Sequence, residues 1–247
     1  MTRLPALVAA ALGVALAVPA PAAVEQAVPG PRLERLGRSV EGRPINLVRI
    51  GDPAAPRKVL VVGSVHGDEP AGRTVVELLR AGGVAPAGAE LLLVRNLNPD
   101  GLRRRTRQNA RGVDLNRNSS VGRRFLGGPG SRYYAGPRPF SEPETRAIRA
   151  LILRERPAVT IWYHQPYALV DRPEAGDDGL TRAYSSLSGL PARQLAPRPG
   201  SMSRWQNARV RAGTSIVVEL PAGPLTAAAA RRHSDTVLAL AVPPPGP

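Results

Sequence analysis

The sequence predicts an α/β protein with a mixed, mostly parallel central sheet flanked by helices. Four short apolar runs rich in β-branched residues are suited to strands buried on both faces, and they span residues 58–65, 90–97, 158–163 and 214–220. Helical patterns lie between these runs, and strands that alternate with helices are typical of a parallel sheet. The chain has 247 residues, of which 43% are hydrophobic and 21% charged, so its composition is that of one ordinary globular domain.

The first elements after a Pro-rich linker have local signals. Polar and apolar residues alternate from Pro44 to Ile50, which predicts an edge strand. A helix is expected from Glu69 to Arg80, because Pro70 suits a first helical turn and two glycines follow the last residue.

Two further helices are expected later in the chain. Ser141 and Glu144 form a capping-box pattern ahead of a helix that runs to about Arg156. A last helix is expected from about Leu225 to Leu240. Two long intervening stretches, 99–140 and 166–213, are expected to be loops that carry function.

The amino terminus predicts export from the cytoplasm. A positive residue, Arg3, precedes an apolar run that is too short for a membrane span of about 20 residues, and small residues follow it. We therefore expect a signal peptide cleaved between Ala20 and Val24, and a secreted or extracytoplasmic protein of the cell envelope without stable membrane insertion. An uncleaved anchor is the alternative. The expected organisation is a signal peptide at 1–23, a linker at 24–35, one main domain at 36–242 and a Pro-rich tail at 243–247.

The composition limits the possible chemistry and partners. The chain has no cysteine, which excludes disulfides, thiolate zinc sites, iron–sulfur clusters and cysteine nucleophiles, so any metal must be held by histidine and carboxylate. The net charge is +15, but all basic residues except Lys58 are arginine, which indicates the coding bias of a G+C-rich genome. Because only 4% of the residues are aromatic and none interleave with the basic runs, we expect no nucleic-acid partner.

Chemically active side chains stand at the carboxyl ends of three predicted strands, the edge where open α/β sheets bind ligands. His66 and Glu69 follow the first strand, His164 follows the third, and Glu219 lies at the end of the fourth. Two histidines and one carboxylate leave a coordination position open for water, as in a hydrolytic zinc site, although the ligand types alone do not exclude another divalent ion. The remaining histidine, His233, is expected on the surface of the last helix or packed against its neighbours.

A hydrolase also needs a base that collects the proton of the attacking water. Glu219 is free for this work if the other three residues bind the metal. A glutamate within an apolar strand is unfavourable unless it has such a task or pairs with an arginine. The stretch 107–118 adds arginine and asparagine side chains, which can stabilise an oxyanion or bind a substrate carboxylate.

These residues belong to a series of motifs that resembles the zinc carboxypeptidase family, carboxypeptidase A-like. The likeness spans about residues 36–240 and keeps the motifs in order. They are 37–45 (GRSVEGRPI), His66-x-x-Glu69, 98–101 (NPDG), 107–109 (RQN), 112–118 (GVDLNRN), 140–144 (FSEPE), His164 and Glu219. The resemblance implies a zinc-carboxypeptidase-like fold, one zinc ion on His66, Glu69 and His164, and Glu219 as the general base.

The resemblance also implies roles for the 107–118 stretch. Arg107 matches the family's carbonyl-polarising arginine, and Asn116 with Arg117 matches the pair that binds the terminal carboxylate of the substrate. Asp114 matches an aspartate that orients the first zinc-binding histidine, as metal-bound histidines generally require.

Within the family, the short chain, the His-Gly-Asp-Glu motif, the Pro199-Gly200-Ser201 segment and Trp205 are similar to the murein tripeptide amidases. Those enzymes cut the bond between γ-D-glutamate and diaminopimelate in cell-wall peptides. The lid tyrosine of digestive carboxypeptidases has no assigned counterpart in this sequence. Tyr184 is one candidate, and Trp205 and Gln206 lie later in the same expected loop, 166–213.

The sequence therefore predicts a secreted zinc metallo-carboxypeptidase or amidase. We expect it to be a monomer whose substrate is a peptide with a free carboxylate, derived from the cell wall. A zinc-dependent deacylase of N-acyl amino acids, of the succinylglutamate desuccinylase or aspartoacylase type, is the enzymatic alternative. A basic wall-binding or nucleic-acid-binding protein is the non-enzymatic one, but it leaves the side chains at the strand ends unexplained.

Overall fold

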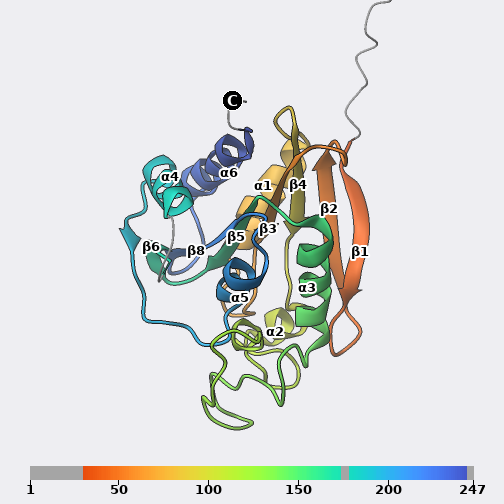
Figure 1. Ribbon diagram of the computed structural model, residues 1–247, viewed down its shortest axis with the longest axis vertical. Helices are drawn as coiled ribbons and strands as arrows, with labels where there is room; N and C mark the ends of the chain where they lie inside the picture. The colour runs from red at the N-terminus through yellow and green to blue at the C-terminus, as the bar shows by residue number, and fades with distance from the viewer. Residues whose placement is uncertain (1–29, 174–177, 244–247) are drawn as a thin grey trace, which may run out of the picture.

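The computed structural model describes residues 30–173 and 178–243 (Figure 1). The predicted signal peptide at 1–23 lies outside the described residues. The strands are β1 (Arg32–Arg38), β2 (Pro44–Gly51), β3 (Arg57–Val62), β4 (Ala89–Val94), β5 (Val159–His164), β6 (Tyr167–Asp171), β7 (Ala192–Arg193) and β8 (Thr214–Pro221). The helices are α1 (Gly72–Gly82), α2 (Pro99–Arg104), α3 (Pro143–Glu155), α4 (Gly179–Ser188), α5 (Met202–Arg209) and α6 (Ala227–Ala241), with a 3-10 helix at Leu115–Arg117.

The strands form one eight-stranded sheet in the order β1-β2-β4-β3-β5-β8-β6-β7. The four predicted apolar runs are its centre, where β4, β3, β5 and β8 pair in parallel. Antiparallel pairs add β2 and β1 on one side and β6 on the other. The predicted mixed, mostly parallel sheet is therefore confirmed, and the carboxyl ends of three of its central strands (β3, β5 and β8) supply site residues.

Helices cover both faces of the sheet. Apolar side chains of α1, α4 and α6 pack into one core, which includes Val76, Tyr184 and Val237. Those of α3 and α5 pack into the other, with Ile148 and Trp205 among them. Among the described residues, no helix is both long and apolar enough to cross a membrane.

Several sequence-based expectations about the edge strand, the linker and the long loops are wrong. The strand β2 does not form the edge of the sheet, because β1 pairs with its outer side. Residues 32–35, expected in the linker, belong to β1. The stretch 166–213 is not a loop: it contains β6, α4, β7 and α5, and two short helical segments likewise interrupt 99–140.

The predicted capping box is also wrong. The N-cap residue of α3 is Glu142, and the hydroxyl of Ser141 donates to the Glu142 carboxylate at 2.7 Å. The Glu144 carboxylate instead accepts a hydrogen bond from the backbone N–H of Val40, at 3.1 Å. The Glu144 carboxylate is thus used in a tertiary contact and the Ser141 hydroxyl in a contact with its neighbour, so neither caps the helix.

Candidate metal centre and active site

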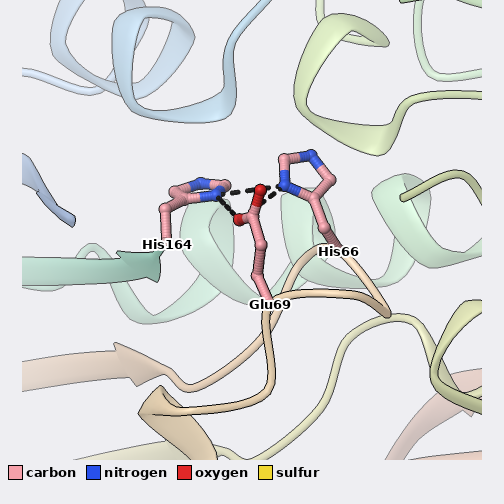
Figure 2. A group of neighbouring side chains, drawn as sticks. All are labelled: His66, Glu69 and His164. Carbon is pink, nitrogen blue, oxygen red and sulfur yellow. Dashed lines mark hydrogen bonds and ion pairs between the residues drawn. The ribbon is translucent and has the colours of Figure 1, made fainter. Parts of the chain in front are cut away.

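The three predicted metal ligands meet at the carboxyl end of the sheet. Figure 2 shows the Glu69 carboxylate between the two imidazole rings. Glu69 Oε2 lies 2.8 Å from His66 Nδ1 and 2.7 Å from His164 Nδ1, and the two Nδ1 atoms are 3.2 Å apart. Tetrahedral ligands of zinc, each about 2.0–2.1 Å from the ion, stand roughly 3.3 Å apart. The donor set is buried and fits a metal ion.

A turn, rather than a helix, brings His66 and Glu69 together. The helix α1 begins only at Gly72, and the N–H of Glu69 donates to the carbonyl oxygen of His66 at 3.3 Å. Gly67 lets this turn pack against the start of α2, because a Cβ at this position would lie 1.9 Å from the carbonyl carbon of Gly101. The helix expected from Glu69 therefore begins three residues later than predicted, although the side chains of His66 and Glu69 do converge.

Asp114 connects the metal set to the neighbouring groups. Its carboxylate lies 3.0 Å from His66 Nε2 and accepts hydrogen bonds from Arg107 Nε at 2.8 Å and from the backbone N–H of Asn116 at 2.9 Å. Although burial opposes ionisation, the neighbouring His66 and Arg107 hold the pKa of Asp114 well below its usual range. An ionised Asp114 fixes His66 Nε2 as a donor, which leaves Nδ1 free to face the metal.

Arg107 is buried between two carboxylates. Besides Asp114, its Nη1 donates to Glu69 Oε1 at 3.0 Å. Burial disfavours the charged guanidinium, but Asp114 and Glu69 raise the pKa of Arg107 above its ordinary value. Its charge therefore stands beside the metal set in a fixed position.

Glu219 lies beside His164, since β5 and β8 pair with these two residues in register. Its carboxylate is fully buried, and within the described part of the chain neither oxygen accepts a hydrogen bond. Burial raises the pKa of Glu219 to about 7, against the opposing effect of Arg198. A carboxyl group that titrates near neutral pH is suited to both taking and returning a proton.

Asn116 and Arg117 lie on the 3-10 helix, next to His164. The Asn116 amide nitrogen is 3.1 Å from His164 Nε2, and its oxygen accepts the N–H of Met202 at 3.0 Å. Arg117 is buried and donates to the carbonyl oxygen of Asn116 at 2.6 Å. A cavity of about 480 Å³ opens next to Asn116, between α5, β8 and the segment before α5.

The structure places all the sequence-predicted site residues in one group, and adds two that the sequence did not indicate. Tyr133 is 43% exposed, and the centroid of its ring lies 5.4 Å from the guanidinium carbon of Arg107 and 5.3 Å from that of Arg117. Arg198 Nη1 lies 3.1 Å from Glu219 Oε1. In the sequence, only its place in an adjacent tyrosine pair of an aromatic-poor chain could have indicated that Tyr133 belongs to the site. No feature of the sequence distinguishes Arg198 from the many other arginines of the chain.

The residues considered for a lid are all buried. Tyr184 lies on α4, where its hydroxyl contacts the Tyr163 hydroxyl at 2.8 Å and His233 Nδ1 at 2.9 Å. Trp205 and Gln206 lie on α5, which is a helix rather than the expected loop. His233 is therefore a helix-packing residue, one of its two expected placements.

This fold and this group of side chains define a class of protein. Residues 22–81 and 84–173 match the family model of the zinc carboxypeptidases, Peptidase_M14, and the chain belongs to that family. The matched ranges contain both histidines and the glutamate of the metal set. The family implies zinc, which the donor set fits.

Within this family, the chain is similar to several murein peptide amidases. Murein peptide amidase A of Escherichia coli K12 is 34% identical over 190 residues, which cover 71% of this chain and 76% of that protein. The Vibrio campbellii murein peptide amidase A is 31% identical over 221 residues, or 83% and 85% of the two chains. The crystal structure of the murein-tripeptide amidase MpaA from E. coli O157 superimposes with a TM-score of 0.68 at 27% identity, covering 94% of this chain and 100% of that one. The chain is thus a hydrolase similar to zinc carboxypeptidases and murein peptide amidases.

Proposed function

We propose that the protein is an exported, monomeric enzyme with one zinc ion, and that it hydrolyses the γ-D-glutamyl-diaminopimelate bond of cell-wall peptides. The observation that carries the proposal is the buried His66, Glu69 and His164 set next to a base, Glu219, whose pKa is about 7. Similarity to murein peptide amidases over most of the chain supports the substrate class. The sequence of residues 1–23 supports export.

Each of the chain's own groups has a role in this reaction. A zinc ion on the three ligands would supply Lewis acidity for water and for the scissile carbonyl. Glu219 takes the proton from the attacking water and returns it to the leaving amine. Arg107, fixed by Asp114 and Glu69, stabilises the negative charge that develops on the carbonyl oxygen.

Binding and orientation fall to the other residues. Asn116 and Arg117 bind the terminal carboxylate of the substrate through charge-assisted hydrogen bonds. Asp114 holds His66 in the tautomer that binds metal through Nδ1. The cavity beside Asn116 receives the side chain of the residue that leaves.

The test is hydrolysis of L-alanyl-γ-D-glutamyl-diaminopimelate by the purified protein without residues 1–23. Diaminopimelate should be released, release should stop with a chelator, and added zinc should restore it. An N-acyl amino acid assayed in parallel tests the deacylase alternative. Hydrolysis of that compound instead of the tripeptide would overturn the proposal, as would release that persists in the chelator.

A further inference from the structure

Arg198 is a charged residue at the site for which the proposed reaction has no role. It lies in the segment that connects β7 to α5, and it lines the cavity beside Asn116. Its side chain is 20% exposed, so it is largely removed from water. Pro197 and Pro199 flank it, which restricts the backbone on both sides.

The segment that carries Arg198 is tied to the proposed carboxylate-binding helix. Gly200 has a φ of +72°, and a Cβ there would lie 2.1 Å from the carbonyl oxygen of Arg117. The carbonyl oxygen of Gly200 accepts the N–H of Ser119 at 3.0 Å, and its own N–H donates to Val121 at 3.0 Å. The position of Arg198 relative to Arg117 is therefore set by the backbone.

The contact between Arg198 and Glu219 is an ion pair that can be exchanged. Arg198 Nη1 and Glu219 Oε1 are 3.1 Å apart, yet the Glu219 carboxylate accepts no hydrogen bond within the described residues. A general base stands about 2.6–3.2 Å from the water that it activates. Arg198 contacts this base, so it is separated from the reacting atoms by little more than the Glu219 carboxylate. Arg198 is therefore close enough to meet a substrate group a few bonds from the scissile carbonyl.

The balance of charge at the site indicates what that group is. Three carboxylates (Glu69, Asp114 and Glu219) lie near three guanidinium groups (Arg107, Arg117 and Arg198). The cavity is also lined by Asp171, Arg172 and Arg204. The charge of Arg198 also acts on Arg117: burial, together with Arg107 and Arg198, lowers the pKa of Arg117 against the effect of Asp114. A divalent metal would make this group of side chains net positive, and a substrate with two or more carboxylates would neutralise that charge.

We propose that Arg198 binds a second carboxylate of the substrate, separate from the terminal carboxylate bound by Asn116 and Arg117. The inference rests on the proposed function, because it concerns the substrate of the same site. Two carboxylates of the tripeptide can fill this place: the α-carboxylate of the γ-linked glutamate and the carboxylate at the far end of the diaminopimelate side chain. Arg198 therefore makes the enzyme selective for peptides with more than one carboxylate.

The experiment compares the wild type with Arg198→Gln and Arg198→Lys on three peptides. The first is the tripeptide, the second carries an amide in place of the glutamate α-carboxylate, and the third carries lysine in place of diaminopimelate. For the peptide that lacks the bound carboxylate, the wild-type kcat/KM should be about tenfold lower or more, mainly through KM. Arg198→Gln should reduce this preference to about twofold, and Arg198→Lys should restore part of it. Arg209→Gln, which removes an exposed arginine of α5, is the matched control and should keep the full preference.

Calorimetry separates this inference from the proposed reaction. Binding of the same peptides is measured without turnover on the zinc-loaded Glu219→Gln protein, with and without Arg198→Gln. If no peptide is hydrolysed, the proposed function fails, but a carboxylate-dependent affinity that Arg198→Gln abolishes still supports the role of Arg198. Equal affinity for all three peptides, or a preference that survives Arg198→Gln, would overturn it.

Discussion

Replacing Asp114 with asparagine is the most direct test of how the metal centre is built. The aspartate accepts hydrogen bonds from three sides, at 3.0 Å from His66 Nε2, 2.8 Å from Arg107 Nε and 2.9 Å from the N–H of Asn116. An asparagine has the same shape, but one of its two polar atoms is a donor. That NH₂ group must then face a donor on either His66 or Arg107, so one of these contacts is lost.

The size of the effect follows from these contacts. Loss of a partner that orients a metal-bound histidine reduces metal affinity by about 10–100-fold. A factor in that range corresponds to about 1.4–2.8 kcal/mol of binding free energy. We therefore expect Asp114→Asn to bind zinc at least about tenfold more weakly than the wild type.

The assay is competition for zinc with a chelator of known affinity, read by elemental analysis of the protein at equilibrium. Asp68→Asn is the matched control, because Asp68 is an exposed carboxylate adjacent to the same motif. Its zinc affinity should stay within about twofold of the wild type. Wild-type affinity in Asp114→Asn would refute the argument that this carboxylate sets the tautomer of His66.

Three further predictions concern separate parts of the molecule. Glu219→Gln should keep its zinc by elemental analysis while kcat falls by about 10²–10⁴-fold, and wild-type turnover would exclude Glu219 as the base. Gly67→Ala should destabilise the fold by roughly 3 kcal/mol in urea denaturation, because its Cβ would lie 1.9 Å from a backbone carbon, whereas Gly128→Ala, with no atom within 4 Å, should be nearly neutral. Burial lowers the pKa of His233 to about 4. The unfolded chain therefore binds more protons between about pH 4 and 6.5, and stability should fall by about 3 kcal/mol as the pH drops through this window. His233→Asn keeps an acceptor for the Tyr184 hydroxyl and should lose this part of the pH dependence, and an unchanged dependence would contradict the assignment.

The metal set was predictable because it depends on strand position. His66 and Glu69 follow β3, His164 ends β5, and Glu219 lies near the end of β8. Parallel strands that are neighbours in a sheet bring their carboxyl ends to one edge. Three apolar runs followed by chemically active residues are therefore enough to predict one site, without any knowledge of the turns between them.

The elements between residues 166 and 213 were not predictable for an equally physical reason. The helix α4 reads GLTRAYSSLS, which is poor in strong helix formers, and α5 buries only Met202, Trp205 and Gln206. Both segments are helical because they pack against faces of the sheet. The sequence of the segment itself gives no indication of this packing. The strand β1 is similar, since its residues form a strand only through pairing with β2.

The site itself shows why Arg198 and Tyr133 escape prediction while the ligands do not. Asp114 orients His66 and caps the 3-10 helix that presents Asn116, and the Asn116 oxygen accepts the first backbone N–H of α5. The metal set, the proposed carboxylate-binding residues and the segment that carries Arg198 are thus linked through hydrogen bonds between parts of the chain far apart in sequence. A side chain placed by such links has no local pattern of its own. Its function can be inferred only once the links are known.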